Sequence, residues 1–148
     1  MEFFTASPGR KKKKIITWLD NNKNIIKWGS ECISIPYQIT EVINGILQTK
    51  SHVYYPDYYY EMRKNDGTLK QVVIEVKPSK EYNDVQLFSE GKFEIKENMT
   101  SKQLVNLEYR FKTAQKNKSK WETMIAWCDK KGYEFIIITE EHLKKFNV

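Results

Sequence analysis

The sequence is poor in cysteine and histidine, which argues against a disulfide-rich or zinc-binding protein. Its two cysteines, Cys32 and Cys128, lie far apart and form no CxxC motif. We therefore expect neither a zinc site nor a disulfide framework. The low cysteine content also favours an intracellular, reducing location. The two histidines, His52 and His142, are isolated, and neither is assigned a catalytic role. No apolar run approaches the roughly 18 residues that a membrane span needs, and the N-terminal charges follow the aromatic residues, the reverse of a signal peptide.

What is present is typical of one globular domain. The chain has 148 residues, of which 40% are hydrophobic and 30% are charged, so it is long enough to bury a core without disulfides or a structural metal. Glycine and proline are few, with 6 and 4 residues, and no linker or repeat divides the chain. We expect residues 1–10 to form a flexible basic arm and residues 11–148 to form a single domain.

The net charge of +6 is unevenly distributed along the chain. Residues 1–14 carry five basic groups against one acid, and residues 101–120 carry six against one acid. The rest of the chain is therefore acidic. Basic clusters on an acidic remainder indicate a polyanionic partner, most often nucleic acid; a solvated lysine-rich face is the alternative.

Hydrophobic spacing predicts a helix over residues 11–22, followed by a β-hairpin. Two β-branched runs, 32–43 and 46–55, flank Asn44-Gly45. Asn-Gly favours the two-residue type I′ turn because both residues there need a positive φ. The turn would pair Ile43 with Ile46. Pro36 indicates that this end of the strand is an edge or a bulge.

The remaining elements are predicted in the same way. Strands over 58–63 and 69–77 flank a turn at Asn65-Asp66-Gly67, and residues 78–99 are expected to form a loop or a small hairpin. Two helices follow, separated by a break at 117–119, the second capped by Gly132. A buried strand over 133–138 and a short helix starting at Thr139 end the chain. This order predicts an α/β sandwich with a mixed sheet.

Three residues carry the chemistry: Asp57, Glu75 and Lys77. Glu75 and Lys77 are two apart in a strand, so both project to one face, while Ile74 and Val76 project into the core. The hairpin lays residues 58–63 antiparallel to 69–77, which brings Asp57 next to Glu75. A surface ladder of ion pairs is the alternative reading of these residues.

Two adjacent carboxylates repel unless a cation lies between them. All-oxygen ligands without nearby histidine or cysteine favour Mg²⁺ or Mn²⁺ over zinc. Such an ion, held by Asp57, Glu75 and the Val76 carbonyl, can activate a water and stabilise charge on a phosphate. Lys77 beside it would orient or deprotonate the water, or stabilise the transition state. This set of groups suits the cleavage of a phosphodiester bond.

Pro56-Asp57 followed by Glu75-Val76-Lys77 resembles the motif of the PD-(D/E)xK nuclease superfamily. A longer series of motifs is similar to the head completion nucleases of T-even-like tailed phages, relatives of the endonuclease that cleaves transposon ends. It comprises Trp18-Leu19-Asp20, Trp28-Gly29-Ser30-Glu31, Ile35-Pro36-Tyr37, Tyr55-Pro56-Asp57, Ile74-Glu75-Val76-Lys77-Pro78, Lys120-Trp121 and Thr139-Glu140. The resemblance implies a restriction-endonuclease-like α-β-β-β-α-β core, with a mixed sheet flanked by helices and here an extended β-hairpin.

One residue departs from the family pattern. Where the family usually has a Glu in the first helix, about six residues before the Trp of Trp-Leu-Asp, this chain has Lys12. That Glu supports a second metal in the family, so its absence bears on two-metal catalysis. Glu31 or Glu2 could stand in for it.

The resemblance implies a Mg²⁺- or Mn²⁺-dependent DNA endonuclease that processes DNA ends during phage head completion. The expected location is the host cytoplasm during assembly, or the virion. Its partners would be double-stranded DNA and the portal or other head-completion proteins. Expected DNA contacts are Arg10, Lys11, Lys12, Lys13, Lys14, Lys116, Lys118 and Lys120. The alternatives are a structural head-completion protein, which Lys12 favours, and a host transposase-like or repair nuclease.

Overall fold

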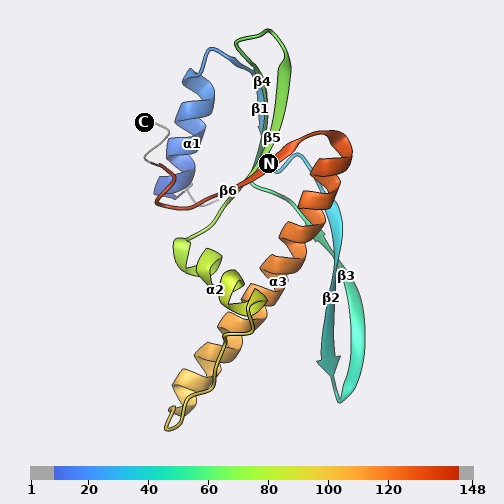
Figure 1. Ribbon diagram of the computed structural model, residues 1–148, viewed down its shortest axis with the longest axis vertical. Helices are drawn as coiled ribbons and strands as arrows, with labels where there is room; N and C mark the ends of the chain where they lie inside the picture. The colour runs from blue at the N-terminus through green and yellow to red at the C-terminus, as the bar shows by residue number, and fades with distance from the viewer. Residues whose placement is uncertain (1–8, 144–148) are drawn as a thin grey trace.

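The computed structural model describes residues 9–143, and its centre is a four-stranded mixed sheet (Figure 1). The strands lie in the order β1-β4-β5-β6. β5 and β6 are parallel, and the other neighbours are antiparallel. The strand bounds are β1 Ile25–Ser30, β4 Tyr58–Arg63, β5 Leu69–Val76 and β6 Glu134–Ile138. The predicted mixed sheet is thus confirmed.

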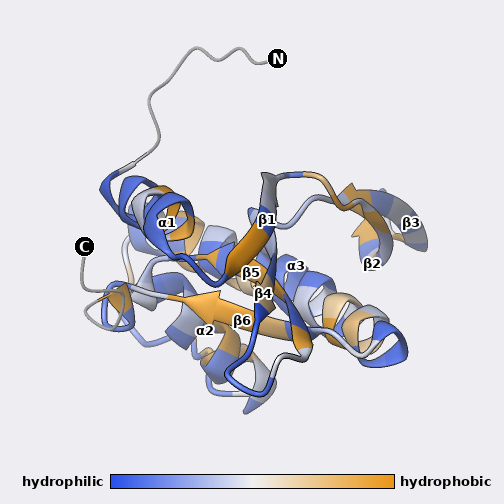
Figure 2. Ribbon diagram, turned by 90° about the horizontal axis from the view of Figure 1, so that it is seen from above, coloured by the Kyte–Doolittle hydropathy of each residue, from blue (hydrophilic) through white to orange (hydrophobic). Residues whose placement is uncertain are grey.

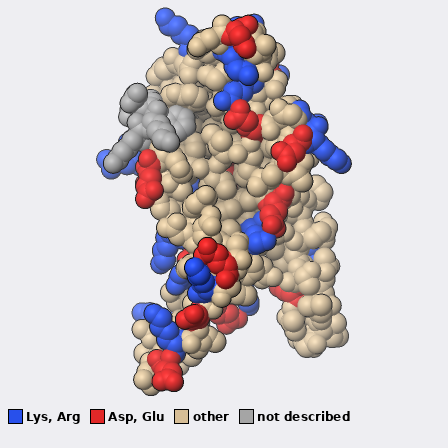
Figure 3. Space-filling model, in the orientation of Figure 1, with Lys and Arg blue, Asp and Glu red and all other residues tan. Residues whose placement is uncertain are grey.

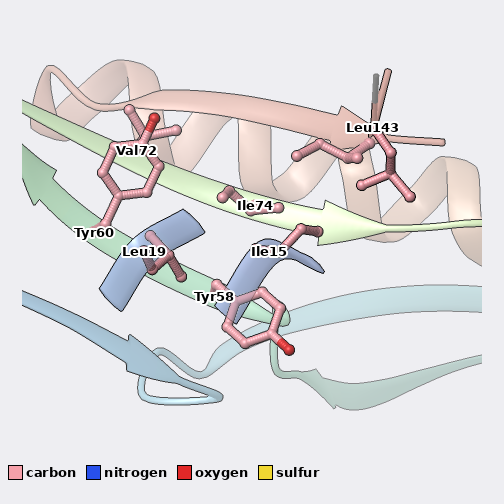
Figure 4. Packing of buried hydrophobic residues seen from close by; sticks show 8 residues of the cluster. Ile15, Leu19, Tyr58, Tyr60, Val72, Ile74 and Leu143 are labelled. Carbon is pink, nitrogen blue, oxygen red and sulfur yellow. The ribbon is translucent and has the colours of Figure 1, made fainter. Parts of the chain in front are cut away.

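One face of the sheet is covered by α1 (Arg10–Asn21), whose apolar stripe carries Ile15 and Leu19. Figure 4 shows these side chains packed on Tyr58, Tyr60, Val72 and Ile74, with Leu143 closing one end. Alternate residues of a strand point to opposite faces. The even-numbered β5 residues therefore define the face toward α1.

The other face is covered by α3 (Ser101–Lys131), which begins at a capping box formed by Thr100 and Gln103 and ends at Gly132. Gly132 has a φ of 72°, the left-handed conformation that glycine adopts at low cost. Met124 and Cys128 of this helix pack against Val73 of β5. Seen from above in Figure 2, α1 and α3 lie on opposite sides of the apolar strands. The odd-numbered β5 residues, which include Glu75, face the side of α3.

The β-hairpin of β2 (Ile35–Ile43) and β3 (Ile46–Tyr54) forms a separate two-stranded sheet that extends away from the centre (Figure 1). Its turn has positive φ at both Asn44 and Gly45, and Ile43 pairs with Ile46, as predicted. Its base is fixed to α3: Ser119 Oγ donates to the Gln38 carbonyl over 2.6 Å. Val42, Ile46 and Leu47 near its tip are exposed.

The structure corrects the predicted element order in two places before α3. Residues 25–30 form β1, which was not predicted because its apolar residues do not alternate. The register between β1 and β4 shifts between Ile25 and Lys27. Residues 79–89 form helix α2 (Ser79–Ser89) instead of a loop or hairpin. Its buried face includes Asp84, paired with Arg110 of α3 at 2.7 Å. A charged residue at a buried position interrupts the apolar spacing from which a helix is predicted.

The predicted break at 117–119 is wrong, since α3 is continuous. Asn117 is buried and donates to Glu81 over 3.4 Å, so a polar residue inside the helix is satisfied by a tertiary contact. After Thr139 the chain forms a turn over 140–142, and the rest of the predicted last helix lies outside the described residues. Arg10 begins α1, and residues 1–8 of the predicted arm also lie outside the description. No described helix is long and apolar enough to cross a membrane.

Candidate active site

Asp57 and Glu75 lie next to each other at one end of the sheet. The register pairs Tyr58 with Ile74, so the residue before β4 faces the residue after Ile74. Asp57 Oδ2 accepts a hydrogen bond from the Val76 N–H over 2.7 Å. The hairpin between β4 and β5 therefore fixes the Asp57 carboxylate beside the carboxyl end of β5.

Glu75 is buried, with 5% of its surface exposed. Its Oε1 atom and the neighbouring Tyr54 hydroxyl are both buried without a hydrogen-bond partner in the described part of the chain. Burial first, and then the Asp57 carboxylate, raise the pKa of Glu75 to about 8, while Lys77 opposes the shift. A buried carboxyl with an unsatisfied oxygen is costly, and a bound cation would relieve that cost.

Lys77 lies between two carboxylates. Its Nζ is 3.9 Å from Glu75 Oε2 and 3.9 Å from Glu81 Oε1 of α2. The side chains of Glu75 and Lys77 are only 6% and 21% exposed, so the pair is not the surface ladder that the sequence allowed. The Lys77 N–H donates to the Ile138 carbonyl over 2.9 Å, which holds the end of β5 against β6.

Lys12 reaches the same site from α1. Its Nζ lies 2.9 Å from Asp57 Oδ1. The neighbouring Lys11 forms an ion pair with Glu140, which also accepts hydrogen bonds from Ser79 at the start of α2. Lys12, in the first turn of α1, is therefore a direct partner of Asp57 in the acidic pair.

The oxygen ligands suit a hard divalent cation. Asp57, Glu75 and the Val76 carbonyl are the groups available, and Mg²⁺ commonly takes one or two carboxylates and keeps several waters. In the described residues no cluster of three or more His, Cys, Asp or Glu side chains occurs. The unsatisfied Glu75 oxygen fits one ion held between the two carboxylates. Among the described acids, neither Glu31 nor any other completes a larger cluster, and Glu2 lies outside the described residues.

The predicted DNA contacts separate into different environments. Lys118 is paired with Glu122 at 2.8 Å on the surface of α3, whereas Lys120 lies over the Tyr54 ring at 5.3 Å, beside the site. Arg10, Lys13 and Lys116 are exposed, and Lys14 is half-buried. On the face seen in Figure 3 basic and acidic side chains are interspersed, so this face has no continuous basic surface.

Two residues near the site were missed by sequence reasoning. Tyr54 ends β3 and lies beside Glu75, where burial and then the Glu75 charge raise its pKa. Glu81 lies four residues after Lys77, a spacing that brings the two side chains together. If residues 79–89 had been predicted as a helix, this spacing would have indicated that Glu81 lies near Lys77.

Comparison with known proteins places this geometry in a family. The chain is 28% identical over 137 residues to the head completion nuclease of Enterobacteria phage T4, covering 90% of this chain and 77% of that protein. No solved structure gives a significant match. Residues 22–140, which include Asp57, Glu75 and Lys77, match the family described as TnsA-like endonuclease N terminal. The chain therefore belongs to the TnsA-like endonuclease N-terminal family, and its role is that of a nuclease.

Proposed function

We propose that the chain is a Mg²⁺-dependent DNA endonuclease of the PD-(D/E)xK type that processes DNA ends during phage head completion. The observation that carries the proposal is the convergence of Asp57, Glu75 and Lys77 at the end of β5, with one buried Glu75 oxygen unsatisfied. Family membership supports endonuclease activity. Similarity to the head completion nuclease supports the process.

The residues of the candidate site would have different roles in hydrolysis. Asp57, Glu75 and the Val76 carbonyl would hold a divalent ion, which when bound lowers the pKa of a water and neutralises charge on the phosphate. Lys77, next to Glu75, is placed to orient or deprotonate the water, or to stabilise negative charge that builds up on the phosphate oxygens. Hydrolysis joins the water oxygen to phosphorus and breaks one P–O bond, and the leaving oxygen takes up a proton.

A cleavage assay on linear and supercoiled duplex DNA tests this function. Wild type should cut with Mg²⁺ or Mn²⁺ and stop cutting when EDTA removes the ion. Glu75→Ala and the closer isostere Glu75→Gln should both lose cleavage, while Glu61→Gln, which alters an acid on β4 away from this group, should not. Equal cleavage by wild type and Glu75→Gln contradicts the proposal.

DNA recognition is proposed to rest on phosphate contacts from the basic segments of α1 and α3. Such contacts carry little sequence information and weaken as salt rises. The portal or other head-completion proteins are the proposed protein partners, with action in the host cytoplasm during assembly or in the virion.

A second candidate function is structural. The ion pair between Lys12 and Asp57 already supplies a cation to the acidic pair, which favours a head-completion protein that grips the DNA end or the portal without cutting. DNA binding by wild type with no cleavage under any divalent ion would support this alternative.

A further inference from the structure

Lys120 is the basic residue of α3 that lies against the candidate active site. Its Nζ is 5.3 Å from the centroid of the Tyr54 ring and 5.8 Å from that of the Tyr37 ring. Tyr54 in turn lies beside Glu75, so the same tyrosine neighbours both the ammonium and the buried carboxylate. Since α3 packs on the face of β5 that carries Glu75, Lys120 and Glu75 lie on the same side of the sheet.

This ammonium has no acidic partner of its own. In the described part of the chain, the ion pairs of basic side chains near the site join Lys12 to Asp57, Lys77 to Glu75 and Glu81, and Lys118 to Glu122. None of the ion pairs there includes Lys120. Burial lowers the pKa of Lys120 and the nearby Lys77 lowers it further, while the Glu75 and Asp57 carboxylates, neither of them in an ion pair with Lys120, raise it. Aromatic faces offset part of the cost of a desolvated cation, but they leave its hydrogen-bond donors without an anion.

The missing partner is an anion that arrives from outside. A duplex phosphate placed next to Asp57 and Glu75 for cleavage would lie between Lys77 from β5 and Lys120 from α3. Lys118, two residues earlier on α3, has its charge satisfied by Glu122 at 2.8 Å. Both lysines belong to the same basic segment of α3. The Lys118 charge is paired with Glu122, whereas the Lys120 charge remains available to bind an anion.

We propose that Lys120 is an active-site residue whose ammonium binds a non-bridging oxygen of the reacting DNA phosphodiester. This inference rests on the proposed function, and it sets Lys120 apart from residues that only hold flanking phosphates. A charge fixed at that oxygen stabilises the transition state more than it stabilises bound DNA, so it acts mainly on the rate of cleavage. The Tyr37 and Tyr54 rings would fix the direction of the lysine stem.

The experiment compares Lys120→Met with Lys131→Met, since methionine keeps an unbranched apolar stem. Lys131 is a matched control because it is another α3 lysine that lies over an aromatic ring, 5.0 Å from the centroid of Trp127, and it lies outside the basic segment 101–120. Cleavage is measured in single turnover with saturating duplex, and affinity is measured by fluorescence anisotropy in EDTA. Lys120→Met should slow cleavage on the order of 10²–10³-fold with a much smaller loss of affinity. Lys131→Met should cleave at nearly the wild-type rate, and Lys120→Arg should recover part of the loss because it keeps the charge.

Thermal unfolding separates this role from a structural one. Lys120→Met should be as stable as wild type or more stable, because it removes an unpaired, half-buried charge; loss of cleavage together with loss of stability that Lys120→Arg does not restore would overturn the inference. Cleavage by Lys120→Met at the wild-type rate would overturn it as well.

NMR gives a readout that does not depend on cleavage, so that a failure of the Lys120 contact can be distinguished from a failure of the proposed nuclease function. Lysines labelled with ¹³C-methyl groups are followed by NMR while duplex is added in EDTA, with the Lys120 signal assigned by its absence in Lys120→Met. The Lys120 signal should move more than the Lys131 signal, which is assigned by its absence in Lys131→Met. A wild type that never cuts but shows this movement contradicts the proposed nuclease reaction and supports the phosphate contact. A Lys120 signal that stays still overturns the contact itself.

Discussion

Lys12 Nζ lies 2.9 Å from Asp57 Oδ1, at the position where a divalent ion held by Asp57 and Glu75 would compete for the same oxygen. The Lys12 side chain is 41% exposed and Asp57 is 13% exposed, so the pair is partly screened by water. Lys12 also lies outside residues 22–140, which match the family. The first helix of this chain therefore brings a cation to the acidic pair, where the family resemblance of the sequence led us to expect an acid.

Replacing Lys12 with Gln should tighten metal binding. A partly exposed ion pair is worth up to about 1 kcal/mol, so Mn²⁺ affinity should rise by up to about fivefold. Isothermal titration calorimetry measures the affinity, with Lys13→Gln, an exposed neighbour in α1, as the matched control. Weaker Mn²⁺ binding by Lys12→Gln would show that Lys12 supports the metal site.

Asp57 and Glu75 should bind one divalent ion together. A crystal soaked in Mn²⁺ should show the ion in contact with both carboxylates and with the Val76 carbonyl. Asp57→Asn and Glu75→Gln should each weaken binding strongly, because each removes a charged oxygen ligand. Glu81→Gln serves as the control, since that acid contacts Lys77 and Asn117 instead. An ion bound to only one of the two carboxylates would contradict the shared site.

The site shows which parts of the molecule can be predicted from its sequence. Asp57, Glu75 and Lys77 could be placed together because two local rules suffice: the period of a strand and the antiparallel return of a short hairpin. The Asn44-Gly45 turn was predictable for the same reason, since its conformation depends on two adjacent residues.

What could not be predicted depends on contacts distant in sequence. Helix α2 buries Asp84 because Arg110 of α3 pairs with it, and α3 continues through Asn117 because Glu81 accepts its side-chain amide. Both cases place polar groups inside, where periodicity expects apolar ones. The pairing of Lys12 with Asp57 spans 45 residues, and no local pattern indicates it.

Lys77→Ala should remove most DNA cleavage while leaving the fold and metal binding nearly intact. Electrostatic groups in such sites typically contribute on the order of 10²–10³-fold to rate. The loss of stability should be small because Lys77 Nζ makes long contacts, 3.9 Å from both Glu75 and Glu81. Lys77→Arg should rescue little, because guanidinium keeps the charge but does not give up a proton at neutral pH. Single-turnover cleavage and thermal unfolding measure the two effects. Undiminished cleavage by Lys77→Ala, in a preparation free of contaminating nuclease, would rule out its role.

The basic segments should contribute affinity without sequence preference. Reversing the charge of Lys116, Lys118 and Lys120 together should weaken duplex binding equally across sequences and flatten the dependence of affinity on salt. Fluorescence anisotropy over a range of salt concentrations measures the slope. A second variant with Arg10, Lys13 and Lys14 reversed tests the α1 segment by itself. An unchanged slope in either variant would remove that segment from the DNA interface.

Glu140 should stabilise the fold in a pH-dependent way. It pairs with Lys11 of α1 and accepts a hydrogen bond over 3.0 Å from the Ser79 N–H at the start of α2, a helix whose N-cap, Pro78, offers no side-chain acceptor. Hydrogen bonds from Lys11 first, and then from Ser79, lower the pKa of Glu140 from 4.5 to about 2. A carboxyl whose pKa is lower in the folded state adds stability above its unfolded pKa and loses it as pH falls toward the folded one.

Glu140→Gln should therefore melt below wild type at pH 6, and the difference should shrink steadily as pH falls from about 4.5 toward 2. Because the Glu140 side chain is exposed to solvent, water screens the interaction and the difference at pH 6 should be small. Thermal unfolding followed by circular dichroism measures it, with the exposed neighbour Glu141 changed to Gln as the control. A difference between wild type and Glu140→Gln that stays constant from pH 6 to pH 3 would mean that the Glu140 charge does not join α1 to α2.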